Sequence, residues 1–272
     1  GAWTPVSGNK YSFTYTVVEG HPDISDASVI PFSIVLDDSN GNASATYTES
    51  TISLSLDAAD CPGIDANSPS ISSVSYSEVD GTTLGIGESV ILTVTATGNE
   101  TGLTAETIEV NGKAATGFND EGDGTYTMTY TVAETDTDID DETEALPINL
   151  ILNDGYNLST PYTTSTAGST PGVDGNRPTI SSVTFSPPTG NTIGVSDILT
   201  VTVTAGEPGL TAAQLSVNGQ TGTIGAWTPG AGNDYSFTYT VNEGHNDISD
   251  ASVIPFSITL NDGVNASDTY TD

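Results

Sequence analysis

Three loops of this chain carry aspartates in pairs, and these are the side chains best suited to bind a metal ion. The two members of each pair are three residues apart, and the pairs are Asp23 and Asp26, Asp138 and Asp141, and Asp247 and Asp250. Ca²⁺ takes about six to eight oxygen ligands, which clustered carboxylates can supply. An EF-hand is excluded because its Asp-x-Asp-x-Asp-Gly pattern is missing from the sequence. A calcium site and a solvated acidic loop both stay open as interpretations.

Two proline-bounded segments supply a second set of oxygen ligands. Residues 62–69 (PGIDANSP) and 171–178 (PGVDGNRP) share the pattern PGxDxNxP, and the candidates in them are Asp65, Asn67, Asp174 and Asn176. Two prolines in so short a segment restrict the backbone, so we expect a semi-rigid connection rather than a flexible tether. The Asp-x-Asn-x-Pro spacing is similar to cadherin-type joints, and this resemblance implies Ca²⁺ between successive domains. Ser68 and Arg177 stand where that family has a further acidic residue.

Four Asn-x-Ser/Thr sequences predict N-glycosylation, and their asparagines are Asn42, Asn99, Asn157 and Asn265. The first, third and fourth occupy one equivalent position in successive copies of a repeat. Asparagine also favours turns for reasons of its own, so a turn residue is the alternative interpretation.

Two histidines also occupy one repeat position. They are His21 and His245, and the copy between them has Asp136 at this place. A shared ligand position and a polar loop residue would each explain the exchange. No nucleophile motif accompanies either histidine, so we expect no catalytic triad and no enzyme.

Composition excludes several classes of partner. The 272 residues carry 36 acidic and three basic side chains, which gives a net charge of −33. Without a basic patch, the chain is unsuited to bind nucleic acid or anionic lipid headgroups. No apolar run approaches the ~20 residues of a membrane span, so we expect no span in this segment. The single cysteine, Cys61, excludes an internal disulfide framework, and we expect an extracellular protein of the cell surface.

An internal repeat organises the chain. Residues 1–38 return as residues 225–262 with 31 of 38 positions identical, and residues 126–155 are a more distant copy of residues 235–263. We call the two outer copies A-type and the middle copy B-type. The predicted divisions are half of a repeat (1–50), a linker (51–66), a complete repeat (67–166), a linker (167–176) and a second complete repeat (177–272).

Alternating apolar residues predict short strands in each copy. Residues 88–97 and 124–132 show a period of two, with valine, leucine and tyrosine on one side and threonine on the other. Further strands are expected at 70–76, 107–110, 147–153 and 158–166. Asn111-Gly112 and Asn218-Gly219 are signals for tight hairpin turns. The expected fold class is therefore all-β: tandem Ig-like antiparallel β-sandwich domains, two complete and one C-terminal half.

Aromatic residues recur at fixed positions of the repeat. One position holds Trp3, Phe118 and Trp227, a second Tyr11, Tyr126 and Tyr235, and a third Phe13, Met128 and Phe237. A sugar-stacking platform and a core anchor would both use such residues. The inward side of the alternation favours the core.

Several of these motifs together resemble bacterial Ig-like repeats of large secreted adhesins and surface fibres. They are the PxISSVxxS opening, the VNG hairpin, the DGTYTxTYTV strand and the IPxxIxLND strand. The resemblance implies the fold. The near-identical tandem copies, the stiff linkers, the acidic charge and the lack of a catalytic motif predict a non-enzymatic structural protein of the cell surface. We expect it to form an extended rod or extracellular filament, with strand sharing between subunits as one way to assemble. The alternative is a Ca²⁺-dependent adhesin with metal-stiffened joints and a glycan- or protein-binding module.

The first half repeat raises the question of its partner. Residues 1–49 hold only the last strands of a sandwich, which bury too little apolar surface to fold alone. The first strands could come from preceding chain, from a neighbouring subunit by strand addition, or lie outside the sequence given. The expected partners are accordingly copies of the same protein or further repeats of the same chain, besides a glycan or protein ligand.

Overall fold

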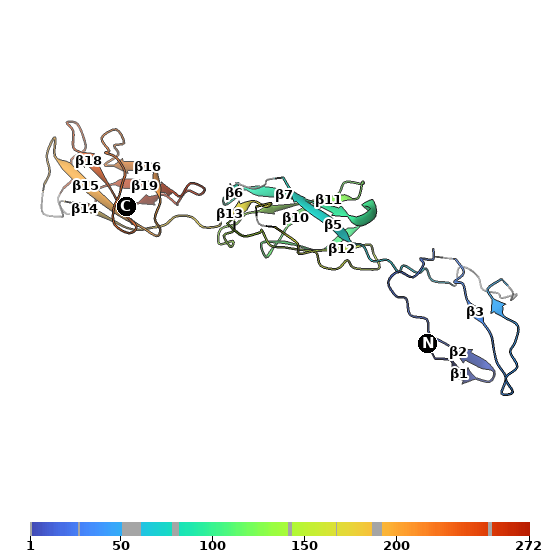
Figure 1. The fold of residues 1–272 in the computed structure, drawn as a ribbon. Coiled ribbons are helices and arrows are strands. Elements are labelled where there is room, and N and C mark those ends of the chain that lie inside the picture. Colours follow the sequence, from blue (N-terminus) through green and yellow to red (C-terminus); the bar gives the residue numbers. More distant parts are fainter. Residues whose placement is uncertain are drawn as a thin grey trace.

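The computed structural model describes residues 2–26, 28–50, 61–77, 82–140, 143–166, 168–186, 192–249 and 252–272. Its three parts follow one another along one long axis (Figure 1). Every regular element in these ranges is a strand except one short 3₁₀ turn, η2 (Thr97–Asn99). None of the helical structure in the described ranges has the length and hydropathy of a membrane-spanning helix.

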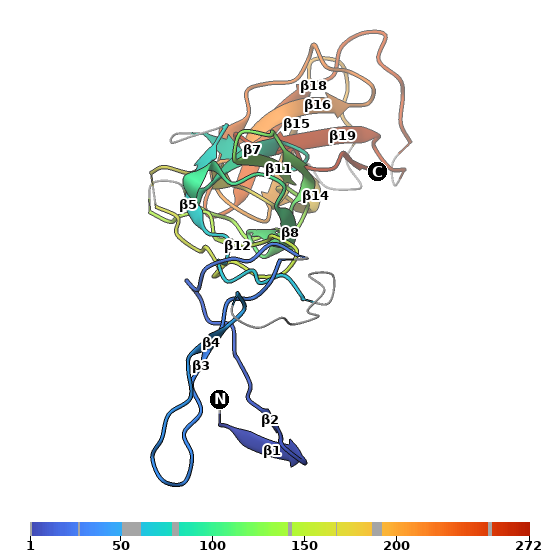
Figure 2. The same ribbon diagram turned by 90° about the vertical axis from the view of Figure 1, so that its right-hand side faces the viewer.

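The middle repeat is a sandwich of two antiparallel sheets. The first has the order β10-β11-β7-β5, and its strands are β5 (Ile71–Tyr76), β7 (Ser89–Ala96), β10 (Thr116–Asp120) and β11 (Thr125–Thr131). The second has the order β12-β8-β9, and its strands are β8 (Thr104–Val110), β9 (Lys113–Ala114) and β12 (Ile148–Asn153). A view along the molecule places β7 and β11 on one side and β8 and β12 on the other (Figure 2).

The last repeat has the same two-layer plan. One sheet has the order β14-β15-β18-β17, with β14 (Ile180–Ser186), β15 (Ile198–Ala205), β17 (Thr228–Pro229) and β18 (Asp234–Thr240). The other has the order β16-β19-β20, with β16 (Thr211–Val217), β19 (Phe256–Asn261) and β20 (Tyr270–Thr271). The prediction of tandem antiparallel Ig-like sandwiches is confirmed.

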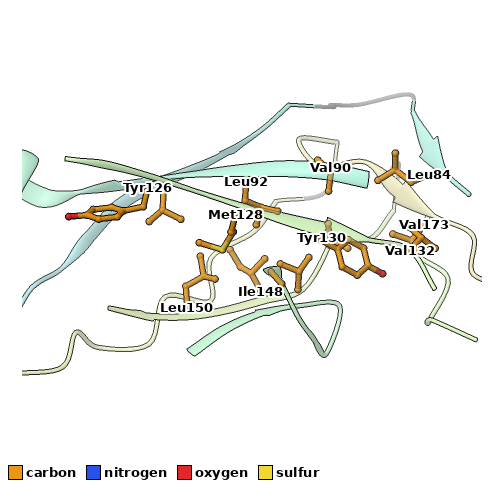
Figure 3. Packing of buried hydrophobic residues seen from close by; sticks show 14 of the residues in the cluster. Leu84, Val90, Leu92, Tyr126, Met128, Tyr130, Val132, Ile148, Leu150 and Val173 are labelled. Carbon is orange, nitrogen blue, oxygen red and sulfur yellow. The ribbon is translucent and has the colours of Figure 1, made fainter. Parts of the chain in front are cut away.

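The core of the middle repeat contains the apolar residues that alternate along β7 and β11, as predicted. On β7, Val90, Leu92, Val94 and Ala96 are buried, and on β11 the buried residues are Tyr126, Met128 and Tyr130. They share one core with Ile148, Leu150 and Leu152 of the opposite sheet. Figure 3 shows Ile148 and Leu150 facing Leu92 and Met128. Burying one such side chain stabilises the fold by roughly 1.5–3 kcal/mol. In the two complete repeats the recurring tyrosines are therefore core anchors, as the inward pattern favoured.

Both predicted Asn-Gly turns form. Asn111 and Gly112 have φ of 52° and 70°, and Asn218 and Gly219 have 52° and 71°. Asparagine and glycine tolerate this left-handed region better than other residues, which explains the dipeptide. One prediction differs in detail: residues 158–166 form the isolated bridges Asn153↔Leu158 and Leu150↔Tyr162 in place of a continuous strand.

The first part has little regular structure. Its strands are β1 (Thr4–Ser7), β2 (Lys10–Ser12), β3 (Ser33–Ile34) and β4 (Tyr47–Thr48). They form two separate two-stranded ladders, β1-β2 and β3-β4, which Figure 2 shows as two arms. β2 and β3 correspond to β18 and β19 of the last repeat, which have seven and six residues. Strands shorten here because the described residues of this part contain no first-half strands against which they could pair.

Two short strands connect the linker to the middle repeat. β13 (Gly172–Val173) lies in the second linker and pairs in parallel with β6 (Thr83–Leu84). Val173 is 1% exposed and belongs to the core of the middle repeat. The second linker is therefore packed against the repeat that precedes it.

Candidate functional site at the joints between repeats

At each joint the linker binds to a loop of the preceding repeat, the loop that follows the recurring tyrosine strand. In the first joint Ile24 and Ile64 exchange two backbone hydrogen bonds of 2.8 Å, and Gly20 N donates to Ala66 O. In the second joint Ile139 and Val173 make the same exchange. Each linker is thus joined to the preceding domain by one antiparallel β-bridge.

An aspartate side chain closes the first bridge. Asp23 Oδ1 accepts from Ala66 N at 2.9 Å and from Asn67 Nδ2 at 2.8 Å. The backbone donor at Ala66, followed by the Asn67 amide, lowers the pKa of Asp23 below its ordinary value of 3.8. Hydrogen bonds donated to a carboxylate favour its charged form.

The second joint repeats this contact. Asp138 Oδ1 accepts from Gly175 N at 2.9 Å, and Asn176 Nδ2 donates to Asp138 Oδ1 and Oδ2 at 2.9 and 2.8 Å. We call this pair of contacts, Asp23 with residues 66–67 and Asp138 with residues 175–176, the linker clasp. Because it occurs in both joints with the same atoms, it is a property of the repeat.

The clasp brings together four of the ten proposed calcium ligands, and in a way suited to hydrogen bonding. The amide nitrogens of Asn67 and Asn176 face the aspartates. Asp65 Oδ1 and Asp174 Oδ1 accept from the backbone of the asparagines two residues on. Among the described residues no three His, Cys, Asp or Glu side chains converge in a metal-binding group. Asp141 and Asp250 lie outside these residues, whereas Asp26 and Asp247 occupy the expected loops.

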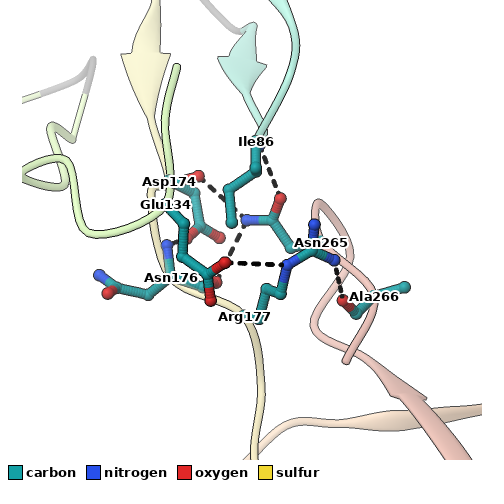
Figure 4. Close-up of polar contacts among 7 residues, drawn as sticks. All are labelled: Ile86, Glu134, Asp174, Asn176, Arg177, Asn265 and Ala266. Carbon is teal, nitrogen blue, oxygen red and sulfur yellow. Dashed lines mark hydrogen bonds and ion pairs between the residues drawn. The ribbon is translucent and has the colours of Figure 1, made fainter. Parts of the chain in front are cut away.

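A second set of contacts holds the last repeat against the second joint (Figure 4). Asn265, which is 5% exposed, accepts from Ile86 N through Oδ1 at 2.8 Å. Its Nδ2 donates to the carbonyl oxygens of Asp174 and Asn176 at 3.0 and 3.2 Å. One side chain of the last repeat therefore contacts both the middle repeat and the linker.

The residues that depart from the cadherin pattern also bind at the joints. Arg177 Nε lies 3.6 Å from Glu134 Oε2, and its Nη1 donates to Ala266 O at 2.9 Å. In the first joint the equivalent Ser68 donates through Oγ to Glu19 Oε2 at 2.8 Å. The carboxylate that meets this position belongs to the preceding repeat in both joints.

Carboxylates crowd at both joints. Burial raises the pKa of Glu207, with further contributions from Asp262, Asp174 and Asp138. Burial also raises the pKa of Asp174, with further contributions from Asp262 and Asp138. At the first joint burial raises the pKa of Glu100, together with Asp154 and Asp65. Like charges that share a partly buried site disfavour ionisation, and protons or cations relieve the repulsion.

The in-register Asn-x-Ser sequences have a structural role. Their serines Ser44, Ser159 and Ser267 accept through Oγ from the backbone N–H groups of Leu36, Leu152 and Leu260. The latter two leucines lie in β12 and β19, and Leu36 follows β3. Asn42, Asn157 and Asn265 each donate their backbone N–H to an aspartate at the start of the turn. Asn99 has φ of 59° in η2. Glycosylation stays a prediction, but a glycan on Asn265 Nδ2 would displace its bonds in the joint.

The exchange of histidine for aspartate also has an explanation. Tyr130 Oη donates to Asp136 Oδ2 at 2.8 Å, and Tyr15 and Tyr239 pair with the Nδ1 atoms of His21 and His245 at 2.6 and 2.7 Å. A backbone N–H three residues before each side chain donates to the same acceptor. Both residue types supply one acceptor that closes the loop, which favours the loop interpretation over a ligand position.

Comparisons with known proteins add no family. No family model matches the chain, and no curated protein matches it. Solved structures similar to it include Rst D1-D2, at 11% identity and a TM-score of 0.28, covering 73% of this chain and 96% of that one. Another is the I9-I11 tandem from titin, at 10% identity and a TM-score of 0.26, covering 75% and 64%. The strand topology itself defines the fold as antiparallel sandwiches in tandem.

Proposed function

We propose that this protein is a non-enzymatic structural repeat protein of the cell surface that forms an extended rod. The observation that supports the proposal is the linker clasp, which recurs at both joints with equivalent atoms. A linker bonded to the preceding domain leaves few free dihedral angles between repeats. Tandem domains joined in this way hold a nearly constant angle to each other, as a spacer or stalk requires.

The second joint supports the proposal further. Asn265 contacts the middle repeat at Ile86 and the linker at Asp174 and Asn176. The last repeat is therefore held both to the linker and to the repeat before it. The charge of −33 keeps neighbouring rods apart and soluble. The expected partners are further repeats or copies of the same protein.

Electron microscopy of the purified chain with negative stain tests the rod directly. We expect straight or uniformly bent particles in which the angle between the last two repeats has a narrow distribution. An Asp138→Ala, Asn265→Ala double variant should broaden that distribution without unfolding either repeat. Broad angles in the unaltered chain would contradict a rod.

The second candidate function is a Ca²⁺-dependent adhesin. The crowded carboxylates at the joints favour it. Burial raises the pKa values of Glu207 and Asp174, repulsion from neighbouring carboxylates raises them further, and a divalent cation would relieve that repulsion. Thermal unfolding with Ca²⁺, with Mg²⁺ and with excess chelator tests it. A ligand that binds only the folded state raises the melting temperature, so equal values in all three conditions would exclude a calcium-stiffened joint. A glycan or protein ligand would then need a site elsewhere.

Filament formation by strand sharing between subunits is a further form of the structural proposal. It depends on what covers the first half repeat, whose apolar residues are exposed.

A further inference from the structure

The first half repeat exposes side chains that the last repeat buries. Tyr11, Phe13 and Tyr15 are 50%, 49% and 52% exposed, whereas their equivalents Tyr235, Phe237 and Tyr239 are 2%, 2% and 3% exposed. Trp3 and Leu36 are also exposed, and Leu260, the equivalent of Leu36, is fully buried. Because the two segments are nearly identical in sequence, the difference in burial comes from the missing neighbours.

Three of these side chains, Trp3, Phe13 and Leu36, line a groove of about 480 Å³ between the two arms of the half repeat. Trp3 and Phe13 line it from the β1-β2 arm, and residues 33–37 line it from the β3 arm. Trp3 stacks on Tyr11 with ring centroids 5.2 Å apart, as Trp227 stacks on Tyr235 at 4.8 Å. The aromatic arrangement of the core is therefore already formed on the open face.

The last repeat shows what fills the equivalent space. β15 pairs with β18 so that Leu199, Val201 and Val203 lie opposite Tyr239, Phe237 and Tyr235. β16 pairs with β19, with Leu215 opposite Ile258 and Ala212 opposite Leu260. Tyr235 Oη accepts from Leu210 N at 3.0 Å, and Trp227 Nε1 donates to Leu210 O at 3.1 Å. All of these neighbours belong to residues 178–224.

We propose that the exposed face of the half repeat is a docking surface for the first half of an A-type repeat, with the sequence pattern of residues 178–224. The geometry points to a segment joined to Gly1 in the same polypeptide. In the last repeat the two halves meet at the peptide bond between Ile224 and Gly225, beside the pairing of Gly225 N with Thr238 O at 2.7 Å. In the docked form, the residue of the added segment that corresponds to Val201 would lie opposite Phe13. The residue that corresponds to Leu215 would lie opposite Ile34.

A B-type first half fits this face less well. In the middle repeat Leu92 lies opposite Met128, whereas in the last repeat the smaller Val201 lies opposite the larger Phe237. Cores are close-packed, so leucine against Phe13 would overpack the site. At the position of Phe13 the face therefore fits the A-type partner better.

A second copy of this chain is also a poorer source. Its strands β15 and β16 are already paired with β18 and β19 of the same chain. Donating them would open a complete repeat and expose a face like the one that becomes covered. An exchange of this kind gains no buried area, so nothing drives it.

The test attaches a copy of residues 177–224 directly before Gly1 of the full chain. A Trp227→Phe background leaves Trp3 as the only tryptophan, and Phe118 occupies this position in the middle repeat, so the change is tolerated by the fold. We expect Trp3 to become protected from aqueous quencher and its emission to shift to the blue. The calorimetric unfolding enthalpy should rise by about half, because it scales with the number of folded residues.

Two controls keep the test decisive. An attached segment with Val201→Asp and Val203→Asp in the copy should leave Trp3 exposed, and a copy with Val201→Leu should protect it less. If the extended chain does not express, the separate peptide 177–224 added to the unextended chain should protect Trp3 at saturation. Equal exposure of Trp3 with and without the segment would overturn the proposal. Protection of Trp3 in the unextended chain that grows with its own concentration would overturn it in favour of a second copy.

Discussion

Asn176 Nδ2 donates to both carboxylate oxygens of Asp138, at 2.9 and 2.8 Å, and thereby ties the linker after the middle repeat to that repeat. Asn67 and Asp23 form the equivalent contact at 2.8 Å one repeat earlier. A contact that occurs twice with the same atoms indicates how every joint of a longer array would be built. Each linker is hydrogen-bonded to the domain before it, and at the second joint the last repeat contacts that linker through Asn265.

Removing the Asp138 carboxylate should free the second linker. Asp138→Ala leaves Gly175 N and the Asn176 amide without their acceptor, at a cost of about 1 kcal/mol. Asp138→Asn keeps one acceptor oxygen, so its linker should be held less firmly than in the unaltered chain and more firmly than in Asp138→Ala. Hydrogen exchange at the Gly175 amide measures the effect, and exchange that is unchanged in Asp138→Ala would show that the clasp does not hold the linker.

Gly85→Ala should weaken the attachment of the last repeat. A Cβ at Gly85 would lie 2.8 Å from Asn265 Oδ1 and 2.9 Å from Val264 Cγ1, so the joint must shift. Gly194 is the equivalent glycine of the last repeat, and a Cβ there meets only Asp197 Oδ2 at 3.9 Å. Solution scattering should therefore detect a wider range of shapes for Gly85→Ala than for the unaltered chain. Gly194→Ala should scatter like the unaltered chain.

The loop acceptor should be exchangeable between repeats. His245→Ala removes the acceptor of the Tyr239 hydroxyl and should cost about 1 kcal/mol of the stability of the last repeat. His245→Asp combined with Gln220→Lys copies Asp136 and Lys113, which are 3.5 Å apart, and should restore most of that loss. Urea unfolding followed by Trp227 fluorescence measures both variants. A double variant no more stable than His245→Ala would refute the equivalence.

Acid should destabilise the middle repeat through Asp136. Burial alone would raise its pKa, but the bonds from Ala133 N, Tyr130 Oη and Lys113 outweigh burial and lower it below 3.8. The folded state then binds fewer protons than the unfolded state, so this stability is present above pH 3.8 and is lost as pH falls through the lowered pKa. Burial also raises the pKa of Tyr130 to about 12, which keeps its hydroxyl protonated as a donor.

Met128, the only methionine, reports on this repeat by the NMR signal of its methyl group. Urea titrations at neutral pH and below pH 3.8 should show a loss of stability in the native chain. The Asp136→Asn variant should be less stable than the native chain at neutral pH. It should also lose less of its free energy of unfolding when the pH is lowered. The same pH dependence in both proteins would assign the effect to other carboxylates.

Local patterns predicted the sandwiches well. The alternation on β7 and β11 identified the buried side, because a half-buried strand must alternate. The Asn-Gly dipeptides placed two turns, because few other residues tolerate their φ angles. The strand expected at 158–166 was less regular, because this segment pairs with β12 only at Leu158 and Tyr162.

The joints were predicted only in part. Aspartates 23 and 138 and asparagines 67 and 176 were singled out as oxygen ligands, but the amide nitrogens of the asparagines make the contact. The contacts of Asn265 with Ile86 and Asp174 join residues far apart in the sequence, and no local pattern indicates them. Glu19 and Glu134 were missed, although each precedes its clasp aspartate by four residues in both copies, which is a signal that the repeat alignment contains.

The distance between the last two repeats tests the rod most directly. In a Cys61→Ser background, spin labels at Glu106→Cys and Ala213→Cys would lie on exposed positions of β8 and β16. Double electron–electron resonance on this chain should give a single narrow distance distribution that broadens when Asp138→Ala and Asn265→Ala are added. A broad distribution in the chain with both joints intact, unchanged by those substitutions, would contradict a rod held by bonded joints.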